Sequence, residues 1–204
     1  MITILDYGLG NVLAFVNVYK RLNIPVNVAR SKNDLVNTTK LILPGVGSFD
    51  NAMQQFEQSG MLLSIEKLVV NQGVPILGIC VGMQMLARAS DEGKLSGLGW
   101  IDGTVRKFDV TTMPVRTCLP HMGWNDVKPV VNGGLFQDIE QDARFYFLHS
   151  YYFECNQQKN IMAETDYGGA FSSAVFNDHV YGVQFHPEKS HHYGSQLLKN
   201  FSEI

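Results

Sequence analysis

The chain has 204 residues, 45% of them hydrophobic, and a formal net charge of −3 from 16 Lys and Arg against 19 Asp and Glu. This content can bury a sizeable core, so we expect one domain over residues 1–204. Mild acidity without long blocks of like charge argues against a nucleic-acid partner. No apolar run is long enough to span a bilayer and the first residues lack a basic leader, so we expect no membrane association and a cytoplasmic location.

The three cysteines, Cys80, Cys118 and Cys155, are widely spaced and contain no Cys-x-x-Cys pair. An odd number at such spacing favours neither a disulfide framework nor a zinc site. We therefore expect a reducing compartment, no metal and no cofactor.

In the first half of the chain, short apolar strands alternate with amphipathic helices, which is typical of parallel βαβ units. Ligands of such sheets bind beyond the carboxyl ends of the strands, so the loops after Asp6, Leu43 and Ile79 should meet at one edge. The predicted strands are residues 2–6, 26–29, 40–43 and 75–79, and the predicted helices are residues 12–22 after an Asn11 cap, 49–58, 61–70 and 83–89.

From Gly99 onward, strands follow one another with turn signals such as Asn177-Asp178 between them, which favours an antiparallel or mixed extension. We therefore predict an α/β fold, with a mostly parallel central sheet flanked by helices and extended by antiparallel or mixed strands. The clearest strands here are 144–148, 151–155, 171–176 and 180–185, and a helix over 195–201 ends the chain.

The stretch 75–86 contains a Gly-x-Cys-x-Gly turn between a predicted strand and a predicted helix. A nucleophile in such a strand–turn–helix is typical of a nucleophile elbow, here with sulfur in place of a serine oxygen. Gly78 and Gly82 would let the strand and the helix approach closely around Cys80. The alternative is a small buried cysteine in a structural turn.

A thiol nucleophile needs a base and a group that orients the base, and His186-Pro187-Glu188 offers both after a predicted strand. The alternative is an ordinary surface turn. By composition the base could also be another histidine, but position after a strand and a nearby carboxylate favour His186. The other histidines considered are His149, His179, His191 and His192.

The backbone N–H of Val81, directly after Cys80, and the glycine loop Gly45-Val46-Gly47 could donate hydrogen bonds to an oxyanion. Gln84 lies one helical turn after Cys80, so it can point into the same pocket. A purely structural turn and an exposed helix glutamine are the alternatives.

Five motifs together closely resemble the class I (triad) glutamine amidotransferases, from Asp6-Tyr7-Gly8 to the final helix. Within this family the chain resembles the glutaminase subunits of imidazole glycerol phosphate synthase. The resemblance implies the family's flavodoxin-like α/β fold. The motifs are PGVG at 44–47, GICVGMQ at 78–84, HMGWN at 121–125, HSY at 149–151 and GVQFHPEKS at 182–190.

The resemblance implies hydrolysis of L-glutamine to glutamate and ammonia through a thioester on Cys80. His186 would protonate the leaving ammonia and activate water, and Glu188 would orient His186. The 45–47 loop would supply an oxyanion donor after rearranging on partner binding. Residues implied to hold the glutamine are Gln84 and the backbone around His149, Ser150 and Tyr151.

The resemblance also implies a partner, a (β/α)8-barrel cyclase that receives the ammonia for histidine biosynthesis. Positions that match the family's interface are Met122, Trp124, Asn125, Tyr146 and Lys189, although packing roles are the alternative.

The chain departs from the family pattern at two places, the bulky stretch His191-His192-Tyr193-Gly194 and Val81. These departures resemble a paralogous glutaminase that supplies ammonia to a sugar amidotransferase in surface-polysaccharide synthesis. This leaves the sugar pathway as an alternative acceptor, and a non-catalytic interaction module on the same fold as a third reading.

Overall fold

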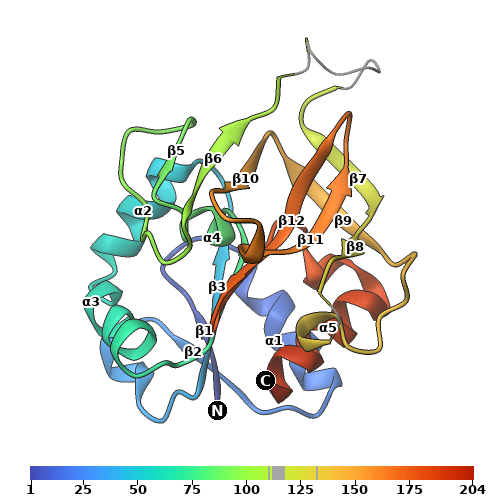
Figure 1. Ribbon diagram of the computed structural model, residues 1–204. Helices are drawn as coiled ribbons and strands as arrows, with labels where there is room; N and C mark the ends of the chain where they lie inside the picture. Colours follow the sequence, from blue (N-terminus) through green and yellow to red (C-terminus); the bar gives the residue numbers. More distant parts are fainter. Residues whose placement is uncertain (110, 112–117, 132) are drawn as a thin grey trace.

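Parallel strands of the first half and antiparallel strands of the second half join in one continuous sheet (Figure 1). The structure is a computed structural model and describes residues 1–204 apart from 110, 112–117 and 132. Its first ten elements are β1 (Ile2–Leu5), α1 (Val12–Arg21), β2 (Val26–Ala29), η1 (Lys32–Leu35), β3 (Lys40–Gly45), α2 (Phe49–Gln58), α3 (Leu62–Glu66), η2 (Lys67–Asn71), β4 (Ile76–Cys80) and α4 (Val81–Gln84).

The second half consists mainly of strands. Its elements are β5 (Ala89–Ser90), β6 (Gly103–Lys107), β7 (His121–Asp126), β8 (Lys128–Pro129), η3 (Gly134–Phe136), β9 (Arg144–His149), β10 (Tyr151–Cys155), η4 (Gln158–Asn160), β11 (Ile161–Asp166), β12 (Ala170–Asn177), β13 (Val180–Val183), η5 (Pro187–Lys189) and α5 (His191–Glu203).

The main sheet has the order β2-β1-β3-β4-β13-β12-β10-β6-β5, with β11 paired to β12 and to β8. Strands β2, β1, β3, β4 and β13 are parallel to one another, and β12 begins the antiparallel part. The two strands β7 and β9 form a separate antiparallel sheet. The predicted mostly parallel sheet with an antiparallel extension is therefore confirmed, and the parallel order matches the flavodoxin-like arrangement.

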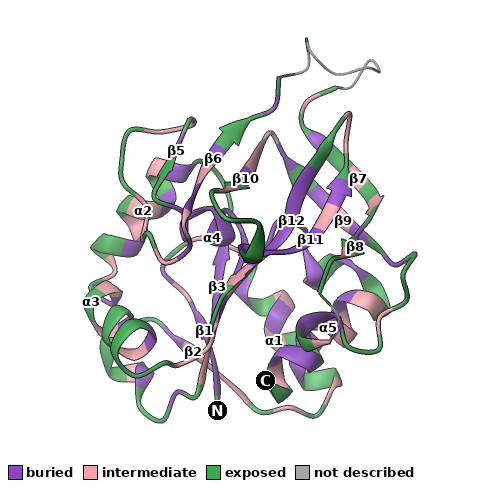
Figure 2. Cartoon of the chain, viewed as in Figure 1, coloured by how far each residue is buried: buried purple, intermediate pink, exposed green. Residues whose placement is uncertain are grey.

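Helices cover both faces of the parallel strands: α2 and α3 lie on one side, and α1 and α5 on the other (Figure 1). Helix α1 begins after Asn11, whose side chain accepts a hydrogen bond from the Ala14 N–H at 3.2 Å, as the sequence predicted. Its apolar stripe packs inward, and the Tyr19 hydroxyl donates to the Leu198 carbonyl of α5 at 3.0 Å. The central strands are buried and the outer faces of the helices are exposed (Figure 2).

The predicted helix over residues 83–89 is wrong, because α4 ends at Gln84 and Ala89 already belongs to a strand. The carbonyls of Met85, Leu86 and Ala87, which a longer helix would use internally, accept instead from the N–H groups of Leu98, Ile101 and Gly99. Tertiary hydrogen bonds therefore replace the helical ones.

Other boundaries also differ from the prediction; among them, β13 ends at Val183 rather than at residue 185. Strand β3 continues to Gly45, α5 begins at His191 rather than at residue 195, and a π-helical turn (η2) replaces the end of the predicted helix 61–70. Strands β5, β6, β7, β8 and β11 were not predicted. Within the described part of the chain, no helix has both the length and the apolar character needed to cross a membrane.

Candidate active site

Cys80 is the last residue of β4 and lies in the sharp turn that leads into α4. Its backbone has φ 56° and ψ −114°, which side-chain-bearing residues rarely adopt. Glycine is required nearby, because a Cβ on Gly82 would lie 1.9 Å from the Leu43 carbonyl oxygen and one on Gly78 would lie 2.6 Å from the Gly82 oxygen. The strand–turn–helix has the geometry expected of a nucleophile elbow.

The glycine loop after β3 lies beside this turn, because Gly45 pairs with Cys80 in the parallel register. Gly45 itself serves close packing, since a Cβ there would lie 2.3 Å from the Gly82 nitrogen. Val46 and Gly47 line the cavity next to Cys80, and Gly47 has φ 87°. The structure thus brings Gly47 to the cavity and leaves Gly45 behind it.

Strand β13 brings His186 to the same edge, although 106 positions separate it from Cys80 in the sequence. Val183 pairs with Ile79, so the chain leaves β13 beside the end of β4. The His186 N–H donates to the Tyr146 carbonyl at 2.8 Å. Ser190 fixes the same turn, since its hydroxyl donates to the His186 carbonyl at 2.6 Å and accepts from the Tyr146 N–H at 3.0 Å.

Glu188 contacts the His186 ring through Oε1, which lies 2.9 Å from Nδ1, and both side chains are buried. A carboxylate accepts, so Nδ1 carries the hydrogen and Nε2 is the nitrogen left for the Cys80 sulfur. Burial lowers the pKa of His186, but its hydrogen bonds to Cys80 and Glu188, and their charges, outweigh burial and raise the pKa to about 10. The ring is therefore protonated near neutral pH.

Two further groups contact the sulfur of Cys80. The Gln184 side-chain amide donates to Sγ at 3.7 Å, and the Leu148 carbonyl oxygen lies 3.9 Å from it. Gln84 is buried one turn along, where its amide donates to the Tyr151 carbonyl at 3.2 Å and to the Gln184 side-chain oxygen at 3.0 Å. Sequence reasoning did not assign Gln184 a role, although it lies within one of the motifs.

A cavity of about 310 Å³ opens beside Cys80 and brings together residues from six separate segments. Among the described residues that line it, Glu92 is the only carboxylate, and no sequence pattern pointed to it. The lining residues are Val46, Gly47, Cys80, Val81, Gln84, Glu92, Pro120, Leu148, His149, Ser150, Tyr151, His186 and Lys189.

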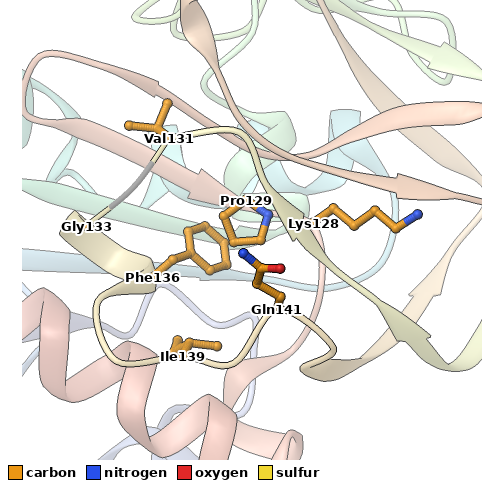
Figure 3. A pocket seen from close by; sticks show the side chains of 7 residues that line it. All are labelled: Lys128, Pro129, Val131, Gly133, Phe136, Ile139 and Gln141. Carbon is orange, nitrogen blue, oxygen red and sulfur yellow. The ribbon is translucent and has the colours of Figure 1, made fainter.

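A second cavity, of about 450 Å³, is larger but lies apart from this chemistry (Figure 3). The described residues that line it include no cysteine, histidine or carboxylate. The residues labelled around it are Lys128, Pro129, Val131, Gly133, Phe136, Ile139 and Gln141.

His149 and His121 form a buried chain of hydrogen bonds behind the cavity. The Tyr151 carbonyl can only accept, so His149 Nδ1, at 2.7 Å, carries the hydrogen. His149 Nε2 then accepts from His121 Nδ1 at 2.9 Å, and His121 Nε2 accepts from the Asn125 amide at 3.2 Å. Burial lowers the pKa of His149 to about 3 and that of His121 to about 4, so both rings are neutral.

The residues predicted to face a partner gather on and around the β7–β9 sheet. Met122 and Trp124 on β7 are 65% and 38% exposed, and Trp124 pairs with Tyr146 across the two strands. The Lys189 ammonium lies 5.5 Å above the Tyr146 ring. Asn125 differs, because its amide is turned inward to His121 and to the Asp166 carbonyl. Of these five predicted interface residues, Lys189 is the one that also lines the cavity beside Cys80.

The glutamine amidotransferase class-I family model matches residues 3–204 of this chain. The chain therefore belongs to the class I glutamine amidotransferases, which use glutamine as the donor of ammonia. It is 61% identical to the imidazole glycerol phosphate synthase subunit HisH of Bdellovibrio bacteriovorus over 204 residues, with both chains fully covered. It is 48% identical to the subunit of the same name from Leptospira interrogans, again with both chains fully covered.

Solved structures agree with this fold. A glutamine amidotransferase structure superposes with a TM-score of 0.76 at 19% identity, covering 99% of this chain and 97% of the other. The structure of PurLQS from Thermotoga maritima superposes with a TM-score of 0.75 at 16% identity, with the same coverage. At such low identity these likenesses concern the fold alone, and they bear out the class I glutamine amidotransferase fold expected from the sequence.

Proposed function

We propose that this chain is the glutaminase subunit of an imidazole glycerol phosphate synthase, which hydrolyses L-glutamine and passes the ammonia to a cyclase subunit in histidine biosynthesis. The observation that carries the chemistry is the contact of a buried His186–Glu188 pair with a cysteine at a nucleophile elbow. The observation that carries the pathway is full-length identity of 61% and 48% to subunits with that name.

The proposed reaction begins when the Cys80 sulfur attacks the side-chain amide carbon of glutamine. The backbone N–H of Val81 and the 46–47 stretch of the glycine loop would donate to the oxyanion that develops on the amide oxygen. Both segments line the cavity next to the sulfur, which supports this assignment. The left-handed φ of Gly47 allows this part of the loop to rotate its peptide groups when a partner binds.

His186 would then protonate the amide nitrogen, so that ammonia leaves and a γ-glutamyl thioester remains on Cys80. The raised pKa of His186 supports this role, because the ring holds a proton near neutral pH. The same ring would next take a proton from water, and the hydroxide would release glutamate from the thioester. Glu188 would hold the ring through Nδ1 during both steps.

The cavity has groups suited to the two ends of glutamine. The α-ammonium group needs a negative partner, and Glu92 is the one carboxylate among the described lining residues. Gln84 and the backbone of residues 149–151 border the rest of the cavity and would hold the side chain. The two buried neutral histidines keep the Tyr151 carbonyl in place behind it.

The chain is a subunit of a multi-subunit synthase by its relatives' names, and we propose a (β/α)8-barrel cyclase as its partner. Exposed Met122 and Trp124, together with Lys189, would form the docking surface, and Lys189, which lines the cavity, would join this surface to it. Free Cys80, Cys118 and Cys155 support a cytoplasmic location. The names of the relatives reported above favour this acceptor over an activated sugar, and membership of the enzyme family excludes the non-catalytic reading.

The test is glutamine-dependent synthesis with the cyclase encoded in the same genome. We expect the mixture to convert glutamine to product, and Cys80→Ala to remove glutamine-dependent synthesis while free ammonia still supports it. Lack of stimulation by that cyclase, together with failure to rescue a histidine-requiring strain without its own glutaminase subunit, would reject the proposal.

A further inference from the structure

Helix α2 and the loop that follows β5 hold each other through two carboxylates. Glu92 Oε2 accepts from the Phe49 N–H at the start of α2 at 2.8 Å. In the opposite direction, Asp50 on α2 accepts from the Lys94 N–H at 2.9 and 3.0 Å and from the Leu95 N–H at 3.0 Å. Residues 92–95 are therefore fastened to the helix at both ends.

The fit between Asp50 and this loop is close. A Cβ on Gly93 would lie 1.9 Å from Asp50 Oδ1, so the carboxylate occupies the space against the loop backbone. Ser48, at the N-cap position, makes no side-chain capping bond to α2, and Glu92 takes that place. Because Oε2 of Glu92 is engaged by Phe49, Oε1 is left for a ligand in the cavity that Glu92 lines.

We infer that Asp50 is a positioning residue that sets the enzyme's preference for substrates with an α-ammonium group, by holding Glu92 at the cavity. This rests on the proposed glutaminase function and on Glu92 as the ammonium partner. A charge-assisted hydrogen bond depends steeply on distance and direction, so a small displacement of the loop would weaken it. Asp50 would not touch the substrate and would act only through the loop.

The test compares two electrophiles that alkylate Cys80 with loss of dinitrogen. One is 6-diazo-5-oxo-L-norleucine, which carries the α-ammonium group, and the other is 6-diazo-5-oxohexanoate, which has the same reactive end without it. Intact-mass spectrometry of the full chain gives both second-order rates, and their ratio measures recognition of the ammonium group. Glu57→Ala is the matched control, because it removes an exposed carboxylate from the same helix.

We expect Asp50→Ala to lower this ratio about tenfold, which is the size of one charge-assisted hydrogen bond. Asp50→Asn keeps one oxygen that can accept from the loop, so its ratio should fall about threefold, and it carries the test if Asp50→Ala does not fold. Glu57→Ala should leave the ratio unchanged. A merely structural role would lower the melting temperature of the Asp50 variants without changing the ratio.

The outcomes separate this inference from the function on which it rests. Unchanged ratios in both Asp50 variants, with the ratio lost in Glu92→Gln, would overturn the role of Asp50 alone. If Glu92→Gln leaves the ratio unchanged, Glu92 does not bind the ammonium group, and the inference about Asp50 is overturned with it. A wild-type chain labelled at Cys80 by neither reagent, both alone and with the cyclase present, would instead count against the glutaminase itself.

Discussion

Replacing Cys80 by glycine should give a more stable protein than replacing it by alanine. The backbone at Cys80 has φ 56° and ψ −114°, and holding a residue with a Cβ there costs about 1–3 kcal/mol. At ordinary positions alanine is instead more stable than glycine, by about 0.5–1 kcal/mol. Taking about 2 kcal/mol for the strain, we expect the unfolding free energy of Cys80→Gly to exceed that of Cys80→Ala by about 1 kcal/mol.

Both substitutions remove the sulfur, so the comparison isolates the Cβ. The assay is urea-induced unfolding at pH 7.5, followed by circular dichroism, with extrapolation to water. Cys155 is the control, because it ends β10 and is not among the positive-φ residues. There, alanine should be more stable than glycine. If Cys80→Ala equals or exceeds Cys80→Gly in stability, the elbow is not strained as described and the reasoning fails.

Three further predictions concern the triad, the buried histidines and the docking surface. Glu188→Gln should lower kcat by roughly 10²–10⁴ with little change in KM, because the ring loses its orienting carboxylate, and steady-state kinetics of the complex would reveal it. In the folded protein the pKa is about 3 for His149 and about 4 for His121, below the ordinary value of 6.5 that applies to the unfolded chain. The unfolded chain therefore binds protons first as the pH falls below 6.5, and the free energy of unfolding should decrease by about 2 kcal/mol per ring at pH 5. Urea unfolding at several pH values should show this slope of the unfolding free energy against pH. In His149→Gln the slope should correspond to about one proton fewer taken up on unfolding, and a slope equal to that of the wild type would contradict the prediction. Trp124→Ala should weaken calorimetrically measured cyclase binding by at least about tenfold, whereas Leu63→Ala, on α3 and 79% exposed, should not; equal effects would locate the interface elsewhere.

Local sequence patterns were enough to place the reactive groups in their elements. The glycines on either side of Cys80 identify the turn because they allow a close approach that a Cβ would block. The apolar period and the sequence limits of α2 agree with the prediction. His186, Pro187 and Glu188 follow the end of a strand, as the pattern indicated. These features depend on neighbours in the sequence, and so they can be predicted from it.

Only the tertiary structure decided where α4 stops and which other groups enter the site. The carbonyls after Gln84 are taken by N–H groups more than ten residues away, so local helix preference could not set that boundary. Glu92 reaches the cavity because the loop is fastened to α2. The pairing of His121 with His149 depends on the β7–β9 register. The sequence by itself determined the reactive side chains and the turns that carry them, because turn chemistry and hydrophobic period are local. The tertiary structure decided which other groups lie next to them, because hydrogen bonds between distant segments exist only once the whole sheet has formed.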